Sequence, residues 1–302
     1  MELLGSPRPA ALREDVFHAL LSLLRGRRTV ALVGAGCSTE SGIPDYRGPV
    51  GRLRSRKPMQ YSEFVGSALG RARYWSRNAV GWPAFSSARP NAAHVALAEL
   101  ERAGVVEGVI TQNVDGLHQA AGSRRIVELH GSLAGVRCLD CGDRTARASF
   151  QESLLERNVE WFERASARGP AALERAPDGD AEVPSADLDS FHVPACAHCR
   201  GVLKPDVVFF GENVPKDRVD AAWCLLERAD VLLVAGSSLT VFSGRRFVYG
   251  ARKAGLPVAI VNLGPTRADD LAAVKVEASL GSVLPRLALE LAHLAPPSAY
   301  VR

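Results

Sequence analysis

The stretch Thr29-Val30-Ala31-Leu32-Val33-Gly34-Ala35-Gly36 decides the fold. Its first five residues are apolar or β-branched and show no polar alternation, which is typical of a strand covered on both faces of a parallel sheet. Two glycines at alternate positions follow. Glycines there let the backbone turn sharply and bring its N–H groups close to a pyrophosphate at the start of the next helix. We therefore predict a buried strand at 29–33 and a phosphate-binding turn at 34–36.

The turn alone is a weak signal, because a turn that only packs a helix against its strand has the same residues. A complete dinucleotide fingerprint has a third glycine, and this chain has Thr39 at that point. A hydride-transferring dehydrogenase also has an acidic residue about 20 positions further on for the adenosine ribose. Here that region holds the basic run 52–57. A dehydrogenase is therefore the weakest enzyme class for this chain.

Further apolar runs of the same kind recur along the chain, and each follows a segment with helical spacing. Alternating helices and buried strands predict an α/β fold, a doubly wound and mostly parallel, Rossmann-like sheet. The predicted helices lie at 16–24, 92–102, 218–229 and 245–254, and the predicted strands at 29–33, 105–111, 231–235 and 258–261.

Two C-x-x-C pairs, Cys138/Cys141 and Cys196/Cys199, interrupt this alternation. Each pair can place two thiolates about 2.3 Å from one tetrahedral zinc ion. Four thiolates leave no open position for water, so we expect one structural zinc per chain; His198 is the competing ligand. The segment between the pairs is too polar to form a core without a metal. We therefore predict a small zinc-binding module at 133–204, inserted in a dinucleotide-binding domain formed by 1–132 and 205–302.

Composition excludes several classes of protein. The chain has 302 residues, 47% of them hydrophobic, and a net charge of +4, which is ordinary for a globular enzyme. The arginines are scattered, so we expect no direct nucleic-acid binding. No apolar stretch approaches the ~20 residues that span a bilayer, so we expect no membrane association. The first residues include Glu2, Glu14 and Asp15 where a basic and then apolar leader would stand, which predicts a cytoplasmic location.

Polar residues follow the strand predicted at 105–111, where open α/β sheets bind their ligands. They are Gln112, Asn113 and Asp115, and the alternative interpretation is that Asn or Asp caps a helix. His130 follows an apolar run, which places it near a cleft, although a lone histidine is more often structural than catalytic. His118 lies on the helix expected after Asp115, and we interpret it as structural.

The stretch GAGCSTESGIPDYR at 34–47 resembles the NAD-binding signature of the sirtuins, the NAD-dependent protein deacylases. The resemblance continues, in the family's order, over residues 30–285. Segments such as Arg73-Tyr74-Trp75 and Gly81-Trp82-Pro83 are most similar to class II sirtuins. The other matching blocks are TQNVD at 111–115, ELHGS at 128–132, KPDVVFFGE at 204–212, GSSL at 236–239 and NLG at 262–264.

The resemblance implies roles for particular residues. It makes His130 the catalytic base, assigns Asn113 to ordering the ribose, and places Asp115 with Ile43 in the nicotinamide pocket. Asp45 and Arg47 would belong to a loop that closes over NAD. The NAD-binding residues that it implies are Gly34, Ala35, Gly36, Thr39, Ile43, Asp45, Tyr46, Arg47, Gln112, Asn113, Asp115, Gly236, Ser237, Ser238, Asn262, Leu263, Gly264 and Leu280.

In sirtuins the acyl oxygen of a modified lysine attacks the nicotinamide ribose, and a histidine then deprotonates a ribose hydroxyl. The resemblance thus implies an acyl transferase that consumes NAD and releases nicotinamide and O-acyl-ADP-ribose, with acyl-lysine proteins as partners. An imidazole, with an ordinary pKa near 6.5, suits that role. A mono-ADP-ribosyltransferase using the same pocket is the alternative, and a non-catalytic NAD-sensing module is the third hypothesis. The segment 48–56 lacks the Tyr-x-x-Arg pair of sirtuins that prefer acidic acyl groups, so acetyl, longer aliphatic and lipoyl groups stay open.

Overall fold

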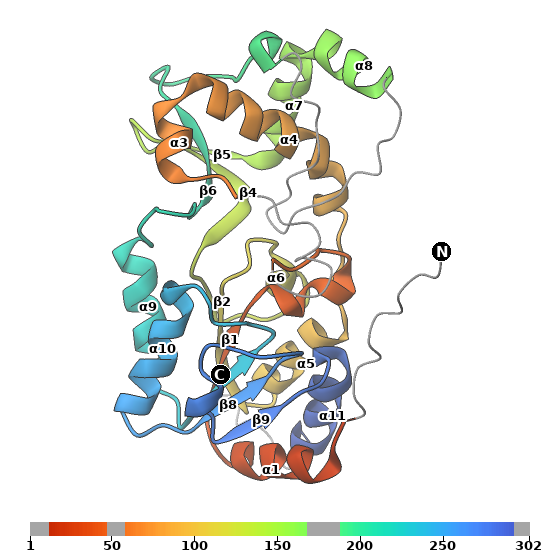
Figure 1. Ribbon diagram of the computed structural model, residues 1–302, viewed down its shortest axis with the longest axis vertical. Helices are drawn as coiled ribbons and strands as arrows, with labels where there is room; N and C mark the ends of the chain where they lie inside the picture. Colours follow the sequence, from red (N-terminus) through yellow and green to blue (C-terminus); the bar gives the residue numbers. More distant parts are fainter. Residues whose placement is uncertain (1–11, 47–57, 168–187, 293–302) are drawn as a thin grey trace, which may run out of the picture.

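The larger sheet of the chain has six parallel strands in the order β3-β2-β1-β7-β8-β9. The computed structural model in Figure 1 describes residues 12–46, 58–167 and 188–292. In chain order the strands read 3-2-1-4-5-6, which is the strand order of doubly wound dinucleotide-binding folds. The predicted α/β fold is therefore confirmed. The strands are β1 (Thr29–Val33), β2 (Val106–Thr111), β3 (Ile126–Glu128), β7 (Val231–Ala235), β8 (Val258–Val261) and β9 (Val274–Val276).

Helices cover both faces of this sheet, and each face has its own hydrophobic cluster. On β1, Ala31 and Val33 face one cluster and Val30 and Leu32 the other, which explains why this strand has no polar alternation. On the first face lie α1 (Glu14–Leu24), α5 (Ala92–Arg102) and α11 (Leu280–Ala292); on the second lie α9 (Lys216–Leu226) and α10 (Phe242–Lys253).

The chain after β1 does not form the regular helix that the sequence predicts. It forms two single 3₁₀ turns, Ala35–Cys37 and Thr39–Ser41. Gly42 ends the second turn with φ of +82°, in the left-handed region that stops helices. Pro44 follows two residues later and does not continue a helix. The turn is therefore short because its own sequence contains the stop signals.

A second, antiparallel sheet has the order β5-β4-β6. Its strands are β4 (Gly131–Cys138), β5 (Arg144–Ala146) and β6 (Leu203–Val207). Around it lie α7 (Arg147–Arg157), α8 (Val159–Ala167), the short turn Leu188–Ser190, and two helices from much earlier in the chain, α3 (Tyr61–Gly66) and α4 (Ala68–Ser86). The remaining short elements are α6 (Leu117–Ala120) and the turn Asp269–Leu271.

The core of this smaller part is formed jointly by the antiparallel sheet, the helices next to it in sequence, and the earlier helices α3 and α4. Phe64 and Trp75 from α3 and α4 belong to one buried cluster with Leu133, Val136 and Phe150. The division of the chain at 133–204 stays a prediction, and this packing favours adding residues 61–86 to the smaller unit.

Arg147 fixes α7 against α4 inside that cluster. Its side chain is fully buried, and its guanidinium lies 4.6 Å from the Trp82 ring centroid. Its Nε and Nη2 atoms both donate to Asn78 Oδ1, at 3.2 and 2.9 Å. Burial lowers the pKa of Arg147 to about 10. The guanidinium stays charged at neutral pH and is stabilised by the amide oxygen and the indole rings.

Some sequence predictions lie outside the described residues, namely those on Arg47 and on the segment 48–57. Among the described helices, none has the length and apolar character needed to cross a membrane.

Candidate functional site

Two glycine loops approach each other at the point where the strand order reverses, between β1 and β7. The Gly36 N–H donates to Gly236 O at 2.8 Å. A Cβ atom on Gly34 would lie 2.7 Å from Ser237 Cβ, and one on Gly36 would lie 2.8 Å from Gly236 O. Only glycine allows this approach. The resulting turn carries no side chain larger than the methyl group of Ala35, which fits the close approach that a pyrophosphate needs.

Asn113 and Asp115 are joined to this turn through a third residue, Ser38. Asn113 Nδ2 donates to Gly34 O at 3.1 Å and to Ser38 Oγ at 3.0 Å. Ser38 Oγ donates to Asp115 Oδ2 at 2.6 Å, and the other Asp115 oxygen accepts from Leu117 N at 3.0 Å. Asp115 therefore both accepts from the first N–H of α6 and belongs to a polar network at the carboxyl ends of the strands. Its predicted contact with NAD stays a prediction.

Gln112 ties three strand ends together at the same edge. Its Nε2 donates to Val33 O at 3.2 Å, at the end of β1, and to Ser237 Oγ at 3.0 Å, after β7. A Cβ atom on Gly244, in α10, would lie only 2.4 Å from Gln112 Oε1. The side chain of Gln112 is thus half-buried between these segments, and it positions the loops around it.

The two ring nitrogens of His130 have different partners. Nδ1 lies 3.0 Å from Gln112 O, and Nε2 lies 2.8 Å from Ser243 Oγ. A carbonyl oxygen only accepts, so Nδ1 carries the proton and Nε2 of the neutral ring accepts from the Ser243 hydroxyl. The imidazole is therefore held in one tautomer with its basic nitrogen aimed at α10.

The surroundings of His130 keep it neutral. Burial lowers its pKa to about 4; the Gln112 carbonyl opposes this shift, and the charges of Arg218 and Arg246 add to it. The ordinary value near 6.5 expected from the sequence is therefore not retained. At neutral pH the imidazole is in its base form.

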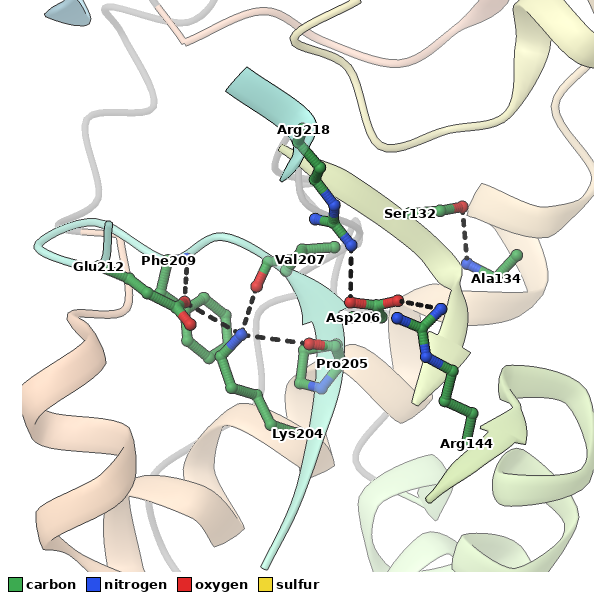
Figure 2. Close-up of polar contacts among 10 residues, drawn as sticks. All are labelled: Ser132, Ala134, Arg144, Lys204, Pro205, Asp206, Val207, Phe209, Glu212 and Arg218. Carbon is green, nitrogen blue, oxygen red and sulfur yellow. Dashed lines mark hydrogen bonds and ion pairs between the residues drawn. The ribbon is translucent and has the colours of Figure 1, made fainter. Parts of the chain in front are cut away.

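Arg218 lies at that position because of Asp206. Figure 2 shows Asp206 between Arg218 and Arg144, with oxygen–nitrogen distances of 2.9 and 3.4 Å. Since the Asp206 charge is shared by two guanidinium groups, it does not cancel the effect of Arg218 on the pKa of His130. In the same view, Ser132 Oγ accepts from Ala134 N at the start of β4.

A buried lysine holds the turn after β6. Lys204 Nζ lies 3.0 Å from Glu212 Oε2, donates to the carbonyls of Pro205 and Val207, and lies 4.7 Å from the Phe209 ring centroid. Glu212 Oε2 also accepts from Phe209 N at 2.8 Å. Burial lowers the pKa of Lys204, and the charge of Glu212 opposes that shift.

The next residues expected to bind NAD belong to the segment 39–46, which follows the glycine turn in the sequence. Thr39 Oγ1 donates to Gly36 O at 3.0 Å. Ile43 is buried in the cluster of the smaller part, and the Tyr46 ring lies edge-on to Phe210, with 6.0 Å between centroids. Asp45, which precedes Tyr46 in the sequence, is half-buried.

The other residues expected to bind NAD, at its phosphates and its adenosine, follow β7, β8 and β9. Asn262 is buried, and its Nδ2 donates to the carbonyls of Leu263 and Gly264 at 3.0 Å each. Ser238 Oγ lies 3.1 Å from Thr240 Oγ1. Leu280 begins α11, and its Cδ1 lies 2.9 Å from where a Gly236 Cβ would stand.

The four cysteines converge as the sequence predicts. Cys138 Sγ lies 3.5 Å from Cys199 Sγ and Cys141 Sγ lies 3.8 Å from Cys196 Sγ, and all four sulfurs are within 4.8 Å of one another. Bonds of about 2.3 Å to a tetrahedral zinc place sulfurs about 3.8 Å apart, so this set fits zinc. His198 is not part of the cluster among the described residues.

The zinc site and His130 lie at opposite ends of β4. His130 precedes Gly131, where β4 begins, and Cys138 ends the strand. Eight extended residues span roughly 25 Å. The metal therefore supports the smaller sheet and does not reach the polar edge.

Three features of the site were not predicted: Ser38, Ser243 and the Lys204–Glu212 pair. Ser38 lies inside the quoted glycine stretch, so its nearness to the turn is the one signal that the sequence offers. Ser243 is 113 positions from His130, and no local pattern connects them.

Comparison with known proteins agrees with this geometry. Residues 34–243 match the model of the Sir2 family. The chain is 54% identical over 275 residues to NAD-dependent protein deacetylase 1 of Mycobacterium avium, covering 91% of this chain and 95% of the relative. It is 48% identical over 282 residues to the mitochondrial NAD-dependent protein lipoamidase sirtuin-4 of Bos taurus, covering 92% and 87%.

A solved structure described as "Sir2-p53 peptide-NAD+" is similar with a TM-score of 0.69 and 33% identity, covering 90% of this chain and 97% of that one. Another, described as "Structural Basis for the Mechanism and Regulation of Sir2 Enzymes", has a TM-score of 0.71 and 34% identity, covering 93% and 100%. With the family model matching well over half of its length, the chain belongs to the Sir2 family, the sirtuins.

Proposed function

We propose that this sirtuin is an NAD-dependent protein-lysine deacylase that releases nicotinamide and O-acyl-ADP-ribose. The observation that carries the proposal is the neutral His130, held in one tautomer at the edge where the glycine turn and the Asn113 network meet. Relatives named as NAD-dependent deacetylases and a lipoamidase support the same reaction class.

When NAD is bound, it supplies the ribose carbon that takes the acyl oxygen as nicotinamide leaves. His130 Nε2 then accepts the proton of a ribose hydroxyl. That hydroxyl takes the place of the Ser243 hydroxyl, which is the donor to Nε2 in the structure described here. The deprotonated ribose oxygen bonds to the acyl carbon as the bond from that carbon to the lysine nitrogen breaks. Because Arg218 and Arg246 disfavour an imidazolium, His130 gives its proton to the departing lysine nitrogen and returns to the neutral form.

The other predicted residues bind and orient NAD in this proposal. The turn at Gly34–Gly36 receives the pyrophosphate, with Ser237 and Ser238 beside it. Asn113 and Asp115, cross-linked through Ser38, define the ribose and nicotinamide end. The stretch Asn262–Gly264 and Leu280 define the adenosine end.

The partners in this proposal are proteins that carry acyl-lysine, since a similar solved structure is described as a complex with acetylated peptide. The metal is one structural zinc held by Cys138, Cys141, Cys196 and Cys199. A thiolate site of this kind needs reduced cysteines, and all six cysteines of the chain are free of disulfides. These features support a cytoplasmic location.

Product analysis tests the function. The chain is incubated with NAD and a panel of acetyl-, longer aliphatic acyl- and lipoyl-lysine peptides, and products are identified by mass spectrometry. We expect free lysine peptide, nicotinamide and O-acyl-ADP-ribose in equal amounts for at least one acyl group. If the protein or peptide gains ADP-ribose and no acyl group is removed, the chain is an ADP-ribosyltransferase and the proposal is wrong.

A further inference from the structure

A second cluster of metal-binding side chains lies behind the glycine turn, away from the zinc cysteines. It consists of Cys37, His94 and His118, whose exposed fractions are 1%, 0% and 1%. One ligand atom from each lies within 4.8 Å of the others. Cys37 ends the first 3₁₀ turn, His94 lies in the first turn of α5, and His118 lies on α6. Three separate elements therefore bring one sulfur and two imidazoles together in the interior.

The hydrogen bonds leave this cluster incomplete. His94 Nδ1 lies 3.0 Å from Asn91 Oδ1 and 3.3 Å from Asn91 N, and His94 Nε2 lies 3.8 Å from Cys37 Sγ. Neither ring nitrogen of His118 has a hydrogen-bond partner within the described part of the chain. A buried polar group without a partner is costly, so an unbonded imidazole beside a thiol and a second imidazole points to a missing ligand.

The protonation states also suit a cation. Burial lowers the pKa of His118 to about 3 and also lowers that of His94, so both rings are neutral at neutral pH, and the lone pair of His118 has no hydrogen-bond donor among the described residues. Burial raises the pKa of the Cys37 thiol, so the thiol gives up its proton only if a cation replaces it. Bonds of about 2.3 Å to sulfur and 2.0 Å to nitrogen in a trigonal plane place these atoms about 3.7 Å apart. The distance from Cys37 Sγ to His94 Nε2 is close to that value.

We propose that Cys37, His94 and His118 form a three-coordinate site for a soft monovalent cation, copper(I). The choice of copper(I) follows from charge and softness. One thiolate and two neutral imidazoles neutralise a single positive charge, whereas Zn²⁺ would leave a net charge in a site that excludes water. Thiolate and imidazole ligands both suit copper. On binding, the Cys37 S–H bond breaks, a sulfur–copper bond forms, and one proton passes to solvent.

The site adjoins the NAD-binding edge. Cys37 precedes Ser38, whose hydroxyl connects Asn113 to Asp115, and Cys37 O accepts from Asn91 Nδ2 at 2.8 Å. A metal bound to Cys37 Sγ would therefore act on the backbone directly before Ser38. We infer that copper(I) lowers the rate of deacylation. This effect on the rate rests on the proposed function, but the proposal that copper binds at this site does not depend on it.

Binding is measured first. The zinc-loaded full chain is titrated, without oxygen, against copper(I) held by a colour-forming chelator, and its zinc content is determined in parallel. Wild type should take up one equivalent of copper, keep its zinc and release one proton. Removing only a hydrogen-bond partner of a ligand lowers metal affinity roughly 10–100-fold. Cys37→Ala and His118→Phe each remove a ligand itself, so each should lower the copper affinity by more than that. Cys224→Ala, which removes an exposed free cysteine, should behave as wild type.

His118→Phe keeps a buried aromatic ring, so it remains informative if Cys37→Ala fails to fold. Equal copper uptake by wild type and both variants would overturn the proposal. The proposal would also be wrong if copper only displaced zinc from the four cysteines, or if the chain bound a second zinc ion in preference to copper. Copper should also lower the deacylation rate of wild type and leave that of Cys37→Ala unchanged.

Discussion

At the scale of single residues, Ser243 determines what His130 Nε2 contacts before NAD binds. A hydroxyl that donates to Nε2 stabilises the neutral ring and so lowers the pKa of His130. Removing it should raise that pKa slightly and leave the ring less firmly oriented. Ser243 is thus a positioning residue, because it acts through His130.

We expect Ser243→Ala to lower kcat/KM by about 2- to 10-fold, since one neutral hydrogen bond that orients the ring of the free protein contributes about 0.5–1.5 kcal/mol. The effect on kcat should be smaller, because the ribose hydroxyl has replaced Ser243 once NAD is bound. The pH profile distinguishes positioning from general damage. Wild type should lose activity only as the pH falls toward about 4, where His130 becomes protonated. The variant should lose it at a higher pH. Ser86→Ala, an exposed serine on α4, is the control. An unchanged acid limb would contradict this role.

Local sequence accounts for some of these residues and not for others. Gly34, Gly36, Asn113 and Asp115 each follow a buried strand directly, so they were predictable once the strands were. The Ser243 contact depends on how α10 packs against the sheet. The low pKa of His130 depends on burial and on arginines from two other elements. Neither effect has a signature in the sequence near His130.

At the scale of elements, zinc is expected to stabilise the smaller sheet by joining the end of β4 to the loop before β6. Cys199→Ser should lower the zinc content and loosen this sheet, and activity should fall indirectly because β4 begins at the residue after His130. Structural zinc contributes roughly 10–16 kcal/mol of apparent binding free energy in small sites. Metal analysis and proteolysis check this, with Cys224→Ala as the matched control. A zinc-free variant of full activity and stability would refute the structural role.

The Lys204–Glu212 pair makes a second prediction for an element, the turn after β6. Glu212→Gln removes the charge that compensates the buried ammonium group but retains an acceptor. We expect a loss of about 1–3 kcal/mol in unfolding free energy, measured by denaturant titration. Glu152→Gln, an exposed change on α7, should have almost no effect. Equal stability of the two variants would show that Glu212 does not hold the turn.

The elements themselves were predictable to different degrees. Strands β1, β7 and β8 have the predicted bounds, because continuous apolar runs are strong signals. The three-residue strands β3 and β9 are too short for any periodicity. Helix α4 buries polar side chains such as Ser76 and Asn78 beside Trp75, so its pattern does not show which face is buried. Asn78 is buried because Arg147, far along the chain, donates to it.

At the scale of the whole molecule, buried neutral histidines should make the fold sensitive to acid. The pKa values of His118 and His130 are lowered to about 3 and about 4, whereas unfolded histidines titrate near 6.5. Below that value the unfolded chain binds more protons, so unfolding free energy rises with pH and is lost as the pH falls. Each such histidine contributes up to about 1.4 kcal/mol per pH unit in that window.

Denaturant titrations at pH 7 and pH 5 measure this dependence. His118→Phe should show a shallower loss of stability than wild type, and His18→Gln, an exposed change on α1, should not. Acid also releases zinc from thiolates, but equally in all three proteins. If the unfolding free energy of His118→Phe falls between pH 7 and pH 5 as much as that of wild type, His118 does not contribute to the acid sensitivity of the fold.

His130 lies where the two sheets of the molecule meet. It follows β3 of the parallel sheet and precedes β4 of the antiparallel sheet, and its carbonyl accepts from Val208 N, just after β6, at 2.9 Å. Its ring contacts the end of β2 through Gln112 and α10 through Ser243. The central claim is that this junction places the base at the NAD-binding edge.

Deacylation by His130→Ala tests that claim most directly, with NAD binding measured on the same preparation and His198→Ala as the control. We expect NAD binding to survive and deacylation to fall by about 10²–10⁴, the usual contribution of a general base. Near-normal deacylation by a folded His130→Ala protein would contradict the account.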